Sequence, residues 1–376
     1  MFLHTHTFRL AGLLALLLTT NQLVAQKSAT SAAMPVLLAS AGHDTIGSSK
    51  KTKTETDASA AYRTPDYDKP ETYTERPIEI KSGEFVLPAI LTMPAGKTSV
   101  PLVVLVHDAG PHDKDMTVGA NKPFRDIALG LAAQGVATVR YDNRTQVYGT
   151  EIFDKIPDFT VQQEVVDDAV AAIRFASKLP GINSQKLFVL GHGYGGIMAP
   201  RIAQSAPELN GIILMATPVR PVQDYLLERK EYEYSLAKYR KPGDAAALNN
   251  LRLQVGNVRS FTLSTNMPSD SLPMGLPASY WLDLREYNQG YVARSLPQRI
   301  MVLHPERDYQ VTLQDLEMWQ RSLHHRGTQY TPVLYSNLNH LMQEGKAGST
   351  PAEFQQPNNV PMYLIRNIST WVRFGL

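Results

Sequence analysis

A glycine-rich hexapeptide at positions 191–196 has the pattern of a turn that presents a nucleophile. It reads Gly-His-Gly-Tyr-Gly-Gly and follows the short apolar run Leu187–Leu190. Glycines at this spacing, between a buried strand and a helix, permit the sharp turn of a G-x-S-x-G motif, whose serine attacks a carbonyl. Here the central residue is Gly193. Because glycine has no side chain, this position cannot form a covalent acyl intermediate.

Two further residues follow apolar runs and could form a catalytic pair. Asp308 comes after Ile300–Leu303, and His340 comes after Pro332–Tyr335. A carboxylate that accepts a hydrogen bond from an imidazole fixes its tautomer, so we expect His340 to lie within hydrogen-bond reach of Asp308. Taken singly, Asp308 could instead cap the following helix, and His340 could be a buried loop histidine.

The segments that would position these residues alternate between strands and helices from Arg76 onward. Strand pairs with intervening helices favour an α/β fold with a mostly parallel central sheet and helices on both faces. Residues 217–297 interrupt the alternation with a charged, partly helical stretch, which has the size of an inserted cap. A capping box of Thr160 and Gln163 should begin one helix. The expected strands are 78–80, 85–93, 102–106, 136–141, 187–190, 211–216, 300–303 and 332–335, with another helix at 123–134.

With these motifs, the chain resembles bacterial esterases of the α/β-hydrolase superfamily, in the dienelactone-hydrolase or serine-aminopeptidase-like branch. The similarity runs from about Arg76 to the C-terminus and includes the string Pro277–Leu284 in the cap. The resemblance implies the α/β-hydrolase fold, with Asp308 orienting the general base His340 and with a serine at position 193. It also implies an oxyanion hole formed by the backbone N–H groups of Tyr194 and of the loop after His107, which includes Ala109.

The chain departs from that family pattern at two positions of one site. Besides Gly193, it has Asp108 where relatives usually have glycine after the histidine. A carboxylate there opposes the negative charge that develops on a substrate oxygen, whereas an oxyanion hole works through donors. Glycine at 193 also relieves the backbone strain of the turn, about 1–3 kcal/mol. Together the two changes predict a pseudoenzyme, impaired in serine catalysis.

Three functions are compatible with these residues. The first is a non-catalytic protein that binds a small ester, amide or acyl compound between cap and sheet. The second is a hydrolase in which His340 and Asp308 activate water, and the third is a cofactor-free lyase that uses His340 as acid or base. Gly193 favours the first, and the retained pair favours the second.

No cofactor or metal site is expected from the sequence. The loop residues His107, His112, Asp113 and Asp115 lack the spacing of helical metal ligands, so we interpret them as surface polar residues. The cap tyrosines are expected to pack the lid rather than to bind a cofactor; they are Tyr232, Tyr234 and Tyr239.

Composition and the N-terminal segment limit the partners and the location. A net charge of +2 gives no electrostatic case for nucleic acid, and the absence of cysteine excludes disulfides, thiolate metal sites, a cysteine nucleophile and a lipoprotein anchor. Arg9, the apolar run Ala11–Leu18 and the small residue Ala25 predict a cleaved signal peptide over residues 1–25, too short to remain as a membrane span. We therefore expect a secreted or periplasmic protein with a flexible polar linker at 26–72 and a hydrolase domain at 73–376.

Overall fold

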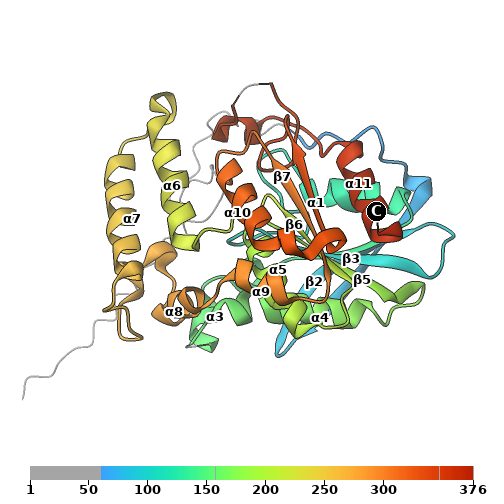
Figure 1. The fold of residues 1–376 in the computed structure, drawn as a ribbon, viewed down its shortest axis with the longest axis horizontal. Helices are drawn as coiled ribbons and strands as arrows, with labels where there is room; N and C mark the ends of the chain where they lie inside the picture. The colour runs from blue at the N-terminus through green and yellow to red at the C-terminus, as the bar shows by residue number, and fades with distance from the viewer. Residues whose placement is uncertain (1–60, 157, 347, 376) are drawn as a thin grey trace, which may run out of the picture. The chain divides into compact units, whose positions relative to one another are not determined.

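An eight-stranded sheet forms the centre of the protein (Figure 1). The computed structural model describes residues 61–156, 158–346 and 348–375. The strand order is β1-β2-β4-β3-β5-β6-β7-β8; β1 and β2 run antiparallel, and the other six strands are parallel to one another. The strands are β1 (Tyr73–Ser82), β2 (Phe85–Pro94), β3 (Val100–Val106), β4 (Ala137–Tyr141), β5 (Ile182–His192), β6 (Gly211–Met215), β7 (Arg299–Pro305) and β8 (Tyr330–Tyr335).

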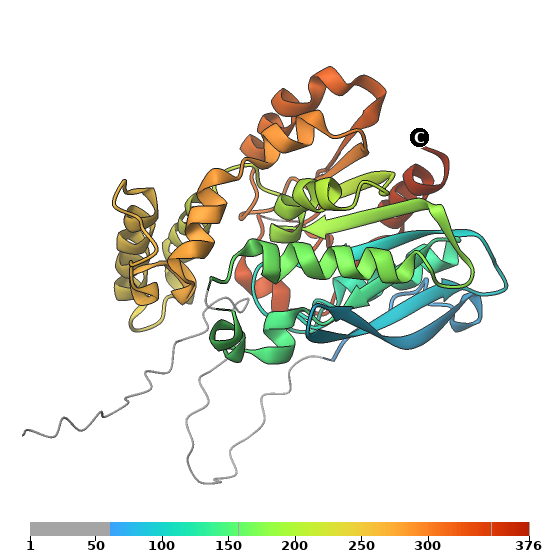
Figure 2. The same ribbon diagram turned by 90° about the horizontal axis from the view of Figure 1, so that it is seen from below.

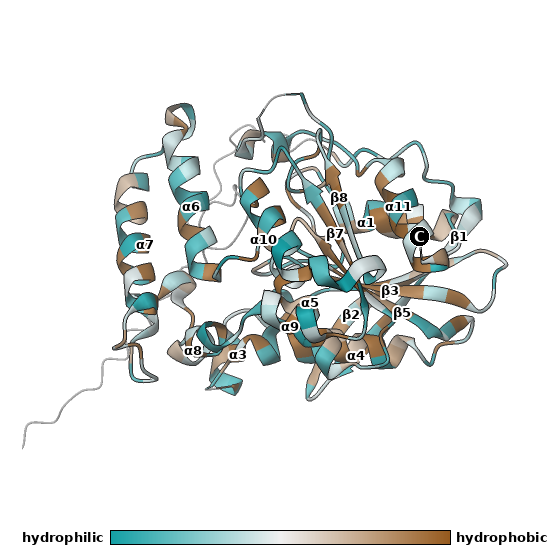
Figure 3. Ribbon diagram, viewed as in Figure 1, coloured by the Kyte–Doolittle hydropathy of each residue, from teal (hydrophilic) through white to brown (hydrophobic). Residues whose placement is uncertain are grey.

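Helices cover both faces of this sheet, as the alternating sequence pattern predicts. Alternate residues of each inner strand enter opposite cores: Val104 and Val106 pack on one side, Val103 and Leu105 on the other. This explains why the inner strands are apolar without interruption, and Figure 3 shows the apolar residues gathered in them. The first core includes residues of α4 (Asp167–Ala176), α5 (Tyr194–Ser205) and α10 (Leu313–Leu323); the second includes α1 (Pro123–Ala133) and α11 (Met362–Phe374).

Four helices occupy the interval between β6 and β7, where the sequence predicts the cap. Figure 2 shows α6 and α7 standing beyond the end of the sheet. The guanidinium of Arg220 joins the insertion to α10 through Asp315, with 2.8 Å between Nη2 and Oδ2. The ring of Tyr232 stacks on Tyr309, with 4.8 Å between the ring centroids. The helices are α6 (Val222–Ser235), α7 (Asp244–Arg259), α8 (Ala278–Glu286) and α9 (Gln289–Ser295).

Local details differ from the expected elements at several points. β5 begins at Ile182, five residues before the apolar run, because Ile182 already pairs with Val100 of β3 ahead of a register shift, and the polar residues that follow, 184–186, are exposed. The side chain of Gln163 accepts from Thr160 N–H, but five residues of π-helix (Gln162–Val166) precede α4. Short helices α2 (Arg144–Tyr148) and α3 (Glu151–Lys155) follow β4.

The N-terminal segment needs one correction. The hydroxyl of Tyr62 donates to Asp126, and that of Tyr67 donates to the carbonyl of Val360, at 2.7 Å each. Residues 61–72, assigned to the linker, therefore pack on the domain. The predicted signal peptide and the linker up to residue 60 lie outside the described residues. Within the described ranges, we find no helix with the length and apolar content needed to cross a membrane.

Candidate active site

The chain makes the predicted sharp turn between β5 and α5 at Gly193. This residue has φ 50° and ψ −113°, and its N–H donates to the carbonyl of Met215 at 2.9 Å. Neighbouring glycines are required by close approach, because a Cβ at Gly195 would lie 2.8 Å from the carbonyl carbon of Val106 and a Cβ at Gly196 would overlap Thr217. The backbone thus makes a sharp strand-to-helix turn whose positive φ glycine adopts without strain, and no side chain stands at its apex.

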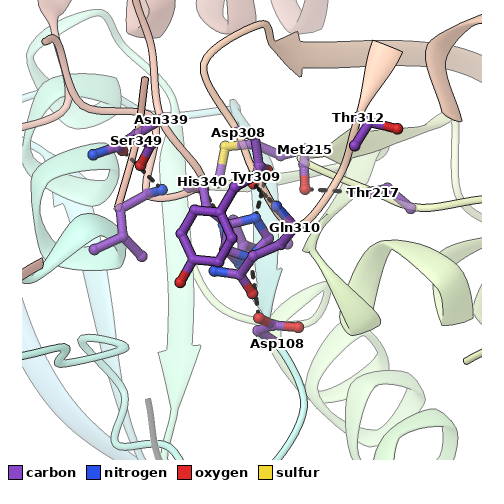
Figure 4. A network of polar contacts seen from close by, with 12 residues as sticks. Asp108, Met215, Thr217, Asp308, Tyr309, Gln310, Thr312, Asn339, His340 and Ser349 are labelled. Atoms are coloured by element: carbon purple, nitrogen blue, oxygen red, sulfur yellow. Dashed lines mark hydrogen bonds and ion pairs between the residues drawn. The ribbon is translucent and has the colours of Figure 1, made fainter. Parts of the chain in front are cut away.

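The hydrogen bond predicted between His340 and Asp308 is present. The distance from His340 Nδ1 to Asp308 Oδ2 is 2.6 Å, and both side chains are buried (Figure 4). The other oxygen of Asp308 accepts from Gln310 N–H at 2.7 Å. Asp308 does not cap the following helix, since the N-cap of α10 is Thr312. The catalytic roles of the pair stay predictions.

Asp108 occupies the centre of this site. Its Oδ1 accepts hydrogen bonds from the backbone N–H groups of Ala109 and Tyr194, at 2.8 Å each. Its Oδ2 lies 3.2 Å from His340 Nε2, so His340 bridges two carboxylates (Figure 4). The donors predicted for an oxyanion hole therefore already hold a carboxylate oxygen of the protein itself.

The carboxylate of Asp108 also fills the space that a side chain at position 193 would need. A Cβ built on Gly193 would lie 2.5 Å from Asp108 Cγ and 3.0 Å from Oδ2. The first distance is one that real Cβ atoms do not adopt, and the second is tighter than most real Cβ contacts. Glycine at 193 and aspartate at 108 are thus sterically linked, and a serine at 193 would require Asp108 to move.

The electrostatics of the site favour a protonated histidine. Burial acts to lower the pKa of His340, but the charges and hydrogen bonds of Asp308 and Asp108 outweigh it and raise this pKa to about 9. Burial acts to raise the pKa of Asp108, yet His340 holds it well below its usual range. Near neutral pH, His340 is therefore an imidazolium that donates one N–H to each carboxylate, with no lone pair for accepting a proton.

A second histidine, His192, belongs to the same cluster and was not singled out from the sequence. It is fully buried at the end of β5, and its ring lies 4.7 Å from the ring of His340 between centroids. Its Nε2 is 2.8 Å from the carbonyl oxygen of His340, while Nδ1 has no hydrogen-bond partner. Burial and the neighbouring His340 lower the pKa of His192 to about 4. The only sequence signal was its place next to Gly193.

Three of the four loop residues interpreted as surface polar groups are buried, and the fourth, Asp113, is half-buried. His107 and His112 are buried, and their Nε2 atoms bond the carbonyls of Asp113 and Ala109, at 3.1 Å each. Asp115 pairs with the fully buried Arg140, with 2.9 Å between Oδ1 and Nε. The two histidines hold the loop together because they satisfy backbone carbonyls that would otherwise lack donors.

Side chains of the cap also lie near Asp108. Helix α6 places Tyr225, which is buried, and Arg229 on this side, and Arg229 pairs with Glu233 at 3.0 Å. Tyr232 packs the lid against Tyr309 as predicted, whereas Tyr239 is exposed. A cavity of about 10 Å³, enough for one water, is lined by Val106, His107, Asp108, Gly110, Tyr141, Asn143, Glu164, Val165 and Tyr194.

Comparisons with known proteins show one family by sequence and the matching fold by structure. Residues 103–354 match the family model described as "Alpha/beta hydrolase family". The chain is 34% identical over 322 residues to an esterase, EstD, of Thermotoga maritima, with 85% of this chain and 71% of that protein covered. Est1E from Butyrivibrio proteoclasticus has a similar fold, with a TM-score of 0.50 at 14% identity over 79% of this chain and 98% of that one. An acylaminoacyl peptidase of Pyrococcus horikoshii gives 0.50 at 14% identity, over 81% and 42% of the two chains.

Proposed function

The chain belongs to the alpha/beta hydrolase family, and from that premise we propose that it is an esterase-like member that has lost serine catalysis. We also propose that it binds a small ester, amide or acyl ligand. The position of Asp108 is the observation that carries this proposal. Its Oδ1 accepts a hydrogen bond from the N–H of Tyr194, and its carboxylate fills the space beside Gly193 that a side chain would need. A substrate carbonyl would find neither a nucleophile nor an open donor there.

The alternative, in which His340 and Asp308 activate water, has weaker support. The pair is intact, with 2.6 Å between Nδ1 and Oδ2. An imidazolium held between two carboxylates is a poor general base, however, because both nitrogens already carry protons. We further propose that the protein acts in the periplasm or outside the cell, which rests on the signal peptide predicted over residues 1–25.

A fluorophosphonate probe tests the loss of serine chemistry. We expect the native protein to remain unlabelled, and Gly193→Ser to label weakly because its Cβ would meet Asp108. Asp108→Gly has no nucleophile and should not label, whereas the double variant has both a serine and open N–H donors and should label best. Adding His340→Gln to the double variant is the control, and it should remove the labelling. Stoichiometric labelling of any serine in the native chain would overturn the proposal.

Ligand binding needs a separate measurement. Thermal-shift titrations of the native protein with short-chain acyl esters, amides and their acids should show a saturable rise in melting temperature for one class. No shift with any of them would refute the binding half of the proposal. Steady hydrolysis of a short acyl ester that is lost in His340→Gln would favour the water-activating alternative instead.

A further inference from the structure

We propose that Asp108, His192 and His340 form a binding site for a divalent transition-metal ion of the zinc class. The ligand atoms that these three side chains offer all lie within 4.8 Å of one another. Ligands of a tetrahedral ion stand about 3.4 Å apart, given metal–ligand distances of about 2.1 Å. The separation of 3.2 Å between His340 Nε2 and Asp108 Oδ2 is close to this value. The other separations, at most 4.8 Å, would shorten by up to about 1.4 Å when an ion binds.

Both histidines already make the outer contacts that metal-ligating histidines make. A ligating imidazole donates its second ring N–H to a carboxylate or a backbone carbonyl, which directs the other nitrogen to the ion. His340 Nδ1 bonds Asp308 Oδ2 at 2.6 Å, which directs Nε2 toward Asp108. His192 Nε2 bonds the carbonyl of His340 at 2.8 Å, so its Nδ1 is the nitrogen with a lone pair.

The free nitrogen of His192 is the observation that points to a ligand. It is completely buried and has no hydrogen-bond partner. A buried polar atom without a partner costs about 1–3 kcal/mol, and buried polar groups are usually satisfied. Coordination of an ion would satisfy Nδ1 without any change in the contact that Nε2 makes.

The charges around the cluster suit a divalent cation. With neutral imidazoles, the buried Asp308 and the partly exposed Asp108 bring two negative charges to the site. The nearby Arg229 is paired with Glu233, with 3.0 Å between Nε and Oε1, so its charge is balanced elsewhere. A dication would take the place of the proton that His340 otherwise shares with the carboxylates. Two imidazoles and one carboxylate favour zinc, cobalt or iron over calcium or magnesium, which prefer oxygen ligands.

This site gives one reason for both departures from the family pattern. Asp108 reaches His340 only because position 193 has no Cβ, which would lie 2.5 Å from Asp108 Cγ. The aspartate thus supplies the third ligand, and the glycine makes room for it. The inference goes beyond the proposed function, because it does not depend on whether an ester or acyl compound binds.

Titration of the full-length, chelator-treated protein with Co²⁺ tests the site directly, because four-coordinate Co²⁺ absorbs visible light far more strongly than the six-coordinate aqueous ion. We expect a saturable spectrum at one ion per chain, and its loss when Zn²⁺ competes. Asp108→Ala, His192→Ala and His340→Ala should each weaken Zn²⁺ affinity, measured by calorimetry, by at least about 100-fold. Asp308→Asn removes only an outer contact and should weaken affinity by roughly 10–100-fold.

Two matched variants serve as controls. His324→Gln changes an exposed histidine just after α10, outside the cluster, and Asp113→Ala changes an acid that bonds Thr117. Both should bind Zn²⁺ like the native protein. A native protein that gives no saturable Co²⁺ spectrum would overturn the inference, even if some variants fail to fold. Binding that survives all three ligand substitutions would do the same. Both readouts are independent of probe labelling and ester binding, so this inference and the proposed function can fail separately.

Discussion

Replacing Gly193 by alanine tests whether a side chain at this position and Asp108 exclude each other. The alanine Cβ would lie 2.5 Å from Asp108 Cγ, so the carboxylate must move. Moving it breaks the bonds to Tyr194 N–H and His340 Nε2, which contribute about 1.5 kcal/mol each as charge-assisted hydrogen bonds. An L-residue held at φ 50° and ψ −113° adds strain of about 2 kcal/mol. Gly193→Ala should therefore lower the free energy of unfolding by about 5 kcal/mol.

A double-mutant cycle separates the steric clash of the alanine Cβ with Asp108 from the backbone strain at position 193. Asp108→Ala alone loses these two bonds and also the bond from Ala109 N–H, so it should cost about 4.5 kcal/mol. In the double variant the two shared bonds are lost only once, so we expect about 6.5 rather than about 9.5 kcal/mol. Urea unfolding followed by tryptophan fluorescence measures all four proteins.

A glycine at a turn elsewhere provides the control for this cycle. Gly149 also has a positive φ of 57°, but a Cβ there would meet nothing within 4 Å. Gly149→Ala should therefore be additive with Asp108→Ala. Additivity of Gly193→Ala with Asp108→Ala, to within about 0.5 kcal/mol, would refute the steric argument.

Two further predictions concern stability. Burial raises the pKa of Glu164 from 4.5 to about 7, although the hydrogen bond from Tyr280 opposes this. Because the folded protein keeps a proton that the unfolded chain releases, the free energy of unfolding should fall by up to about 3 kcal/mol as pH rises from 4.5 to 7. Glu164→Gln should flatten this part of the stability profile. An unchanged slope in this variant would show that Glu164 is not the group that titrates. A chain that starts at Tyr73 loses the bonds of Tyr62 and Tyr67 to the domain. It should be less stable than a chain that starts at Ala61 by about 2 kcal/mol, or roughly 4 °C in Tm by calorimetry, and equal melting would show that the segment contributes nothing.

The sequence alone was sufficient to predict the architecture. It was also sufficient to predict that residues far apart in the chain meet at one edge of the sheet. Uninterrupted apolar runs marked strands that are covered on both faces, and the helices between them required these strands to be parallel. Parallel strands bring their carboxyl ends to the same edge. For this reason Gly193, Asp308 and His340 could be placed together, and the Asp308–His340 hydrogen bond could be predicted.

Only the tertiary structure decided what the site contains. Asp108 meets Tyr194 N–H and His340 Nε2 across separations of 86 and 232 residues, and no local pattern shows where its carboxylate turns. The sequence gives no sign that His192 keeps a buried nitrogen without a partner, because its partners also come from remote segments. Periodicity and turn motifs report the backbone, which local sequence largely determines. The direction of a side chain in a packed site depends on volume and charge supplied by the rest of the chain.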